Sequence, residues 1–154
     1  MEPIDRRTVL LAFCVVIRTI VPVSAAGPGF PQTDACRFRC PGSTKPVPRP
    51  AHRSSANGCG TGDFKIPASA LPHPEFETCC NRHDICYDTC GENRTSCDEI
   101  FEKCMTGVCQ TRASSKDNCL ATSRLFTTMT AEHGCDPFLK SQKKACVCRA
   151  TDEL

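Results

Sequence analysis

Two adjacent residues, His83 and Asp84, together offer a proton acceptor and an oxygen ligand for a cation. A glycine-rich segment at 58–62 precedes them, and a second carboxylate, Asp98, follows them. Calcium prefers oxygen ligands, and a turn with glycine at alternate positions can aim several carbonyl oxygens at one point. A histidine base, a carboxylate that orients it and a bound cation are the parts of metal-assisted hydrolysis. The alternative is that His83 is a buried structural histidine.

A helix from Glu75 to Cys90 is predicted to carry this pair. The segment lacks proline and glycine, its first turn is acidic, and Gly91 follows as a stop. Residues three and four apart share one side of a helix. That side holds Cys79, Cys80, His83, Cys86, Tyr87 and Cys90. We therefore expect disulfides to frame the imidazole.

A second helix is predicted from Thr95 to Val108, where apolar residues recur at helical spacing. The connection at 91–96 is only six residues long, so the two helices should pack antiparallel. This connection contains a glycosylation sequon at Asn93. Further along, a moderately helical segment runs from 117 to 133, followed by a predicted break at 134–137 and a cysteine-rich end.

The amino-terminal part divides into two segments by composition. Residues 1–26 begin with Arg6 and Arg7, continue with a mostly apolar run and end with small residues, as in a secretory signal peptide. The run is too short for a span of roughly 20 apolar residues, so no transmembrane anchor is expected. Residues 27–57 are rich in proline and predict an irregular arm, with Lys45, Arg49 and Arg53 on a solvated backbone. A surface tail is the expectation for this arm, and a patch that binds an anionic surface is the alternative. Residues 58–154 then form one domain.

The 15 cysteines predict an oxidised framework. Cys14 leaves with the signal peptide, and the remaining even number can form up to seven bridges. Cys36 and Cys40 are expected to pin the arm to the domain. Structural zinc is the alternative, but the cysteines do not form the paired knuckles of such sites. The net charge of +2 gives no support to nucleic-acid binding.

Three motifs in order resemble the secreted phospholipase A2 family. The run Cys-Cys-Asn-Arg-His-Asp-Ile-Cys-Tyr at 79–87 resembles its active-site signature, Cys-Cys-x-x-His-Asp-x-Cys. Gly-Cys-Gly-Thr-Gly at 58–62 is similar to its calcium loop, and Cys97-Asp98 with Cys104 resembles its Cys-Asp segment. The proline-rich arm, the short connection and the Cys-Val-Cys ending at 146–148 are most similar to the group XII branch. Members of that branch are described as weak or atypical catalysts, and some have lost the histidine.

The resemblance implies a mainly α, disulfide-rich fold with two antiparallel disulfide-linked helices and a calcium-binding loop. It also implies calcium-dependent hydrolysis of the sn-2 ester of glycerophospholipids. In that chemistry His83 takes a proton from the attacking water, so no covalent intermediate forms. Asp98 accepts a hydrogen bond from the other imidazole nitrogen, and Tyr87 helps to hold Asp98.

By the same resemblance, Ca²⁺ is the cofactor and has its own ligand set. The implied ligands are the Asp84 carboxylate and backbone carbonyls of Gly58, Gly60 and Gly62, with the Gly60 amide sharing the oxyanion. The implied disulfides are Cys59–Cys80, Cys79–Cys104 and Cys86–Cys97.

The sequence departs from the family pattern in three places. An amphipathic first helix has no counterpart before Cys59. The loop between Cys59 and Cys79 is long and has Asp63 where a glycine is usual, so the calcium ligand set can include Asp63. The strand pair that normally separates the two long helices is missing.

The expected partner is a phospholipid membrane or micelle surface that serves as substrate, with a protein receptor as a further candidate; a monomer is expected. One alternative is a phospholipase-like lipid carrier or receptor ligand with little or no activity. A disulfide-built toxin or inhibitor is another, although such a scaffold does not need His83, Asp84 and Asp98 together. The expected location is extracellular; the ending 151–154, Thr-Asp-Glu-Leu, also resembles an endoplasmic-reticulum retrieval signal.

Overall fold

The computed structural model describes residues 36–62 and 64–150. The predicted signal peptide with Cys14, the candidate ligand Asp63 and the retrieval-like ending at 151–154 lie outside these residues. No helix in the described part of the chain is long and apolar enough to cross a membrane.

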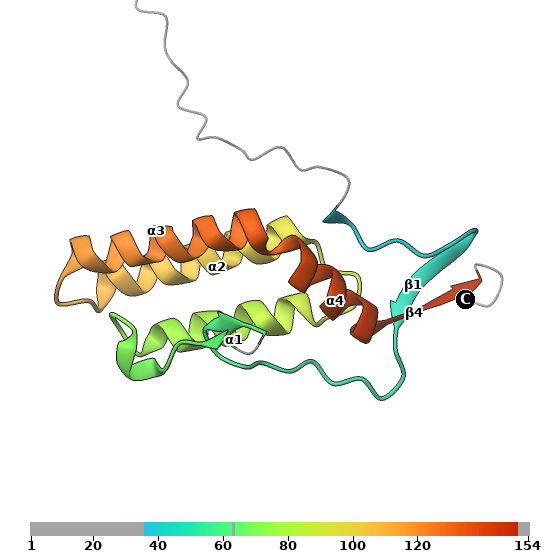
Figure 1. Cartoon of the computed structure of the whole chain (residues 1–154), viewed down its shortest axis with the longest axis horizontal. Helices are drawn as coiled ribbons and strands as arrows, with labels where there is room; N and C mark the ends of the chain where they lie inside the picture. The colour runs from blue at the N-terminus through green and yellow to red at the C-terminus, as the bar shows by residue number, and fades with distance from the viewer. Residues whose placement is uncertain (1–35, 63, 151–154) are drawn as a thin grey trace, which may run out of the picture.

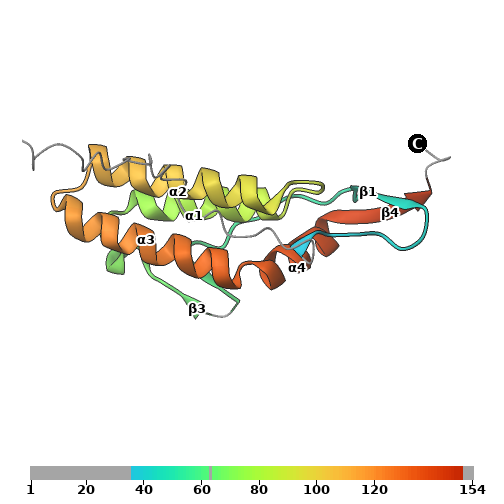
Figure 2. The ribbon, with the colours of Figure 1, turned by 90° about the horizontal axis from the view of Figure 1, so that it is seen from above.

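Four α-helices form the body of the molecule: α1 (Glu75–Tyr87), α2 (Arg94–Thr111), α3 (Lys116–His133) and α4 (Cys135–Ala145). The first three lie alongside one another, and α4 continues from the end of α3 toward the carboxyl terminus (Figures 1 and 2). The predicted first three helices are confirmed, with no end shifted by more than three residues. At the start of α2, the Asn93 side chain accepts a hydrogen bond from the Ser96 amide, which is a standard N-cap.

Disulfides fix the antiparallel pairing of α1 and α2. Cys79, near the start of α1, is bonded to Cys104, near the end of α2, while Cys86 and Cys97 join the opposite ends. This crossed pattern requires antiparallel helices, so the predicted orientation and both implied bridges are confirmed. The implied third bridge, Cys59–Cys80, is also present.

The predicted break at 134–137 is wrong beyond its first residue. Gly134 interrupts the helices, but α4 begins at the next residue and includes Pro137. A proline in the first turn of a helix sacrifices no internal hydrogen bond, because the amides there have no partner. The proline therefore marks the beginning of a helix instead of a loop.

The proline-rich arm is more ordered than the sequence predicts. Strand β1 (Thr44–Pro48) pairs with β4 (Cys146–Ala150) in an antiparallel ribbon that projects from the helices (Figures 1 and 2). The expectation of an irregular arm is wrong here, because a two-stranded ribbon consists of edge strands and edges accept proline. The expected pinning is confirmed by the Cys36–Cys135 and Cys40–Cys148 bridges.

Arg49 is exposed but forms specific hydrogen bonds to the end of α4 and the start of β4. Its Nε donates to the Lys144 carbonyl at 2.6 Å, and its Nη2 donates to the carbonyls of Lys143 and Cys146 at 3.0 and 2.8 Å. These carbonyls belong to the end of α4 and the start of β4, where backbone acceptors lack helical partners. Arg49 thus ties the arm to the carboxyl end of the helix.

Two short elements complete the fold. Strands β2 (Gly60–Thr61) and β3 (Phe64–Lys65) form a hairpin, and the 3-10 helix η2 (Ala68–Ala70) leads toward α1.

The core between α1, α2 and α3 is small and contains Phe76, Phe101, Met105, Val108 and several half-cystines. The remaining bridges join Cys90 to Cys146 and Cys109 to Cys119. Covalent links therefore supplement a modest apolar core.

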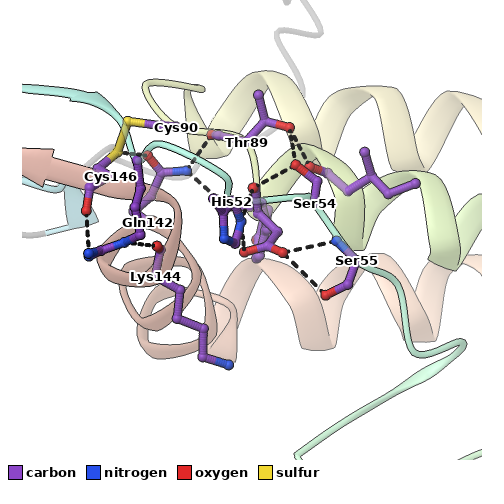
Figure 3. Close-up of polar contacts among 12 residues, drawn as sticks. His52, Ser54, Ser55, Thr89, Cys90, Gln142, Lys144 and Cys146 are labelled. Atoms are coloured by element: carbon purple, nitrogen blue, oxygen red, sulfur yellow. Dashed lines mark hydrogen bonds and ion pairs between the residues drawn. A yellow bond between two sulfur atoms is a disulfide. The ribbon is translucent and has the colours of Figure 1, made fainter.

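Buried Gln142 on α4 holds the turn that follows α1. Its Nε2 donates to the carbonyls of Tyr87 and Thr89 at 2.8 and 2.7 Å, and its Oε1 accepts from the Gly91 amide at 2.9 Å. Figure 3 shows Gln142 between this turn and the Cys90–Cys146 bridge. The neighbouring network includes buried Asp88, whose carboxylate accepts from the Ser55 amide at 3.0 Å.

Replacing Gln142 with leucine should lower the free energy of unfolding by about 3 kcal/mol, because each buried group left without a partner costs roughly 1–3 kcal/mol. Guanidinium unfolding of the oxidised protein measures this loss. Exposed Gln110 on α2 provides the matched control, and its leucine variant should change the free energy by less than about 0.5 kcal/mol. Equal effects at both positions would contradict the role given to Gln142.

Candidate functional site

His83 and Asp98 face one another from α1 and α2. The His83 Nε2 lies 2.8 Å from Asp98 Oδ1, and the Tyr87 hydroxyl donates to the same oxygen at 2.6 Å. A carboxylate only accepts, so the Nε2 atom carries the hydrogen and the Nδ1 atom keeps its lone pair. The pair predicted from sequence is therefore arranged as a base with an orienting partner.

The imidazole is held between two rings. The His83 side chain is only 10% exposed, with the Tyr87 ring centroid 4.1 Å away and that of Phe101 4.7 Å away. Burial, and secondly the nearby Asp98 carboxylate, raise the pKa of Tyr87 well above its usual range. The Tyr87 hydroxyl consequently remains a hydrogen-bond donor to Asp98 throughout the physiological range.

Arg94 completes the environment of Asp98, and sequence reasoning missed it. Its Nε lies 3.3 Å from Asp98 Oδ2, and its Nη2 donates to the carbonyls of Thr130 and Ala131 on α3. Its Nη1 also contacts Cys36 Sγ at 3.4 Å. An available signal was the four-residue spacing between Arg94 and Asp98, which places both on one helix face. Starting the predicted helix at Thr95 hid that spacing.

Arg94 acts as a positioning residue in this arrangement. An Arg94→Gln variant should lose roughly tenfold in turnover through disorder of the Asp98 carboxylate, whereas Arg94→Lys should recover part of the loss by keeping the charge. Steady-state kinetics would separate an effect of this variant on kcat from one on KM. A change in KM alone would contradict a role in orienting the His83 ring.

The glycine segment is attached to α1 at consecutive points. The Asn57 amide donates to Asp84 Oδ2 at 2.9 Å, and the Gly58 amide donates to Asn81 Oδ1 at 3.0 Å. The next residue forms the disulfide to α1. Gly60 has a φ of 146°, and a Cβ there would clash with the Phe64 carbonyl across the hairpin. The segment is thus fixed beside Asp84, as the sequence predicts.

The donor set beside Asp84 fits a hard cation. Burial raises the pKa of Asp84, although the Asn57 amide and His83 oppose that shift. Within residues 36–62 and 64–150 no lysine or arginine pairs with this carboxylate. Asp84 is a half-buried carboxylate beside the glycine segment, and a carboxylate supplies the negative charge and oxygen atoms that calcium prefers. Gly58 and Gly60 line the same cavity as Asp84, whereas Gly62 lies at the hairpin turn and does not.

A zinc-type centre does not occur in the described part of the chain. The one group of nearby histidine, cysteine or acidic side chains there combines Cys86 and Cys97 with Glu92. Both cysteines are bonded to each other, so their sulfur atoms are not thiolate ligands. These two cysteines therefore form one of the expected disulfide bridges.

We call the hydrogen-bonded pair of His83 and Asp98 the dyad. An apolar cavity of about 430 Å³ opens onto the histidine of this dyad. The hairpin, α1, α2 and α3 all contribute to its wall, with Ile66, Phe101 and Phe126 among the lining residues. Phe64, Leu125 and Met129 also line it and are 66%, 58% and 48% exposed. Helix α3 thus provides a wall where the sequence showed no amphipathic first helix.

Gly134 is another site residue that sequence reasoning missed. A Cβ at this position would clash with the Thr130 carbonyl and lie 2.7 Å from the Tyr87 hydroxyl. Only glycine therefore allows the α3–α4 junction to pack against Tyr87. No local sequence signal distinguishes this close approach from an ordinary helix end.

Comparisons with known proteins agree with this architecture. The family model for the group XII secretory phospholipase A2 precursor matches residues 30–154. Mouse and human group XIIA secretory phospholipases A2 are 36% and 34% identical over 121 and 120 residues, which are 74% and 73% of this chain. A mouse group XIIB secretory phospholipase A2-like protein is 35% identical over 130 residues, or 76% of this chain. No solved structure matches.

The helical disulfide-linked fold, the dyad and these matches define a protein of the secretory phospholipase A2 class. Within that class, the chain belongs to the group XII family. The chain spans less than two thirds of the length of the two group XIIA relatives, 62% and 63%.

Proposed function

We propose that this protein hydrolyses the sn-2 ester of glycerophospholipids in a calcium-dependent reaction and releases a fatty acid and a lysophospholipid. The observation that carries the proposal is His83, which lies in the wall of an apolar cavity and is hydrogen-bonded to Asp98. The cavity accepts an acyl chain, and the base lies beside a carboxylate suited to a cation.

Each residue has one task in this proposal. His83 accepts a proton at Nδ1 from the attacking water, while Asp98 and Tyr87 hold the ring. Asp84 would hold calcium together with the backbone carbonyls of Gly58, Gly60 and Gly62. Bound calcium supplies positive charge for the lipid phosphate and for the oxyanion. The Gly60 amide is the proposed additional donor to that oxyanion.

Vesicles labelled separately in the sn-1 and sn-2 acyl chains test the proposal. The purified, oxidised protein should release the sn-2 label in calcium and should release neither label in excess EGTA. Equal release in calcium and chelator would reject calcium dependence, and preferential release of the sn-1 label would reject the proposed bond. Adding calcium back to the chelated sample should restore release of the sn-2 label, which controls for loss of active protein.

A lipid-binding module or receptor ligand is the second candidate. One relative is named a phospholipase A2-like protein, and the exposed apolar side chains around the cavity can contact lipid without hydrolysis. Vesicle binding that persists with no fatty acid released would favour this function. Sedimentation of the protein alone tests the expected monomer.

We also propose that the protein is secreted, in keeping with relatives named secretory. Those names give no support to retention through the ending at 151–154. We expect to recover the protein from the culture medium instead of the cell lysate. Retention of the protein in the lysate would contradict the proposed secretion.

A further inference from the structure

Positive charge is concentrated at one end of the molecule. Residues 37–53 and 136–149 contain nine lysines and arginines and one acidic residue, Asp136. These two ranges include β1, α4 and β4, which lie together at the end opposite the α2–α3 connection (Figure 1). The overall net charge of +2 therefore conceals a strongly basic end, which the proposed hydrolysis does not use.

This basic end contains a surface hollow of about 590 Å³ that is lined entirely by cationic residues. Lys140, Lys143 and Lys144 lie on one face of α4, because they are spaced three and four residues apart. Arg49 is fixed beside them by its hydrogen bonds to the Lys143 and Lys144 carbonyls. In Figure 3 the Lys144 side chain points away from Gln142. Within the described chain, none of the four forms an ion pair.

The ribbon extends the same charge away from the helices. Lys45 on β1 is directly opposite Arg149 on β4, and both are exposed. Like charges in directly opposed positions destabilise a strand pair. The Cys40–Cys148 bridge holds the strands together despite this repulsion. A bound anion would remove the repulsion.

Local structural roles explain only part of this pattern. Lys143 and Lys144 lie in the last turn of α4, where cations favour the helix dipole. The Arg49 guanidinium donates hydrogen bonds to backbone carbonyls. Neither role accounts for Lys140 or for the opposed Lys45 and Arg149.

We propose that this basic end, defined by Arg49, Lys140, Lys143 and Lys144 with Lys45 and Arg149, binds a linear sulfated polysaccharide. A row of cations along a helix and a projecting ribbon matches a linear chain of sulfate groups. The exposed large apolar side chains among the described residues are Phe64, Ile85, Ile100, Leu125 and Met129. None of these lies on β1, α4 or β4, so this end lacks the apolar anchors that favour a bilayer.

Heparin is the probe for a direct test with the full oxidised protein. The wild type should bind immobilised heparin at 0.15 M NaCl. A Lys140→Gln, Lys143→Gln, Lys144→Gln variant should bind at least ~10-fold more weakly. By analogy with nucleic-acid phosphates, its slope of log affinity against log salt should fall by roughly two. The charge-matched control replaces Lys103, Lys116 and Arg124, which lie on α2 and α3, by glutamine and should bind like the wild type.

Vesicles of phosphatidylserine and phosphatidylcholine distinguish a polysaccharide from a membrane. Binding of the wild type to these vesicles but not to heparin overturns the proposal, as does equal loss of heparin binding in both triple variants. Circular dichroism confirms that the variants fold. Hydrolysis of dispersed short-chain phospholipid should be unchanged in the α4 variant, so failure of heparin binding is separable from failure of the phospholipase proposal.

Discussion

Replacing His83 with glutamine should lower phospholipid hydrolysis by roughly 10²–10⁴-fold, which is the contribution of a positioned general base. Glutamine can keep a hydrogen bond to Asp98, but its amide has no basic lone pair at the position of Nδ1. The expected loss is therefore in turnover, with little change in vesicle binding. Initial rates at saturating calcium, together with vesicle sedimentation, measure the two effects separately.

His133 provides a matched control, because it lines the same cavity but is exposed and does not pair with Asp98. A His133→Gln variant should retain most of the activity. Comparable losses in the two variants would mean that the cavity tolerates no change at either histidine. Full activity of His83→Gln would remove His83 from the proposed chemistry.

Asparagine in place of Asp84 should weaken calcium binding by at least ~10-fold, because the only carboxylate in the proposed ligand set is lost. Hydrolysis should fall in parallel and recover partly at high calcium. Isothermal titration with calcium measures the affinity directly. An Asp117→Asn variant removes an exposed carboxylate from the start of α3 and should leave calcium affinity unchanged.

The same Asp84 variant should not destabilise the protein in EGTA. Burial raises the pKa of Asp84 from 3.8, so the folded state binds this proton more tightly than the unfolded state does. Between 3.8 and the raised pKa, the contribution of this group to stability falls as pH rises. At neutral pH, asparagine removes that cost, and the denaturation midpoint should be equal or higher. A clear decrease would show that Asp84 stabilises the fold without calcium.

Local patterns were sufficient for the three long helices and for the dyad. The Glu75–Tyr87 helix lacks proline and glycine, and the Arg94–Thr111 helix has apolar residues at helical spacing. A short connection joins the two helices, so their packing could be predicted. His83 and Asp98 were identified through motifs whose spacing follows from that packing. Gly58 and Gly60 lie beside Asp84 as predicted, while their binding of calcium remains a prediction.

Long-range pairing was not predictable from those patterns. Strand β1 contains prolines and pairs with β4, which lies about a hundred residues later in the sequence. No local pattern of apolar and polar residues predicts that pairing. Gly134 matters because Tyr87 approaches it from another helix. Arg94 matters because carbonyls of α3 fix its guanidinium beside Asp98. Each feature depends on contacts that exist only after the chain has folded.

The seven bridges close rings of very different size, and this sets an order in which they can form during synthesis. Cys109–Cys119 and Cys86–Cys97 span 10 and 11 residues, whereas Cys36–Cys135 and Cys40–Cys148 span 99 and 108. The short rings can oxidise while the chain is still being synthesised. The two longest require nearly the whole chain and must displace any earlier partner by thiol–disulfide exchange. Anchoring of the basic ribbon is therefore among the last covalent events of maturation.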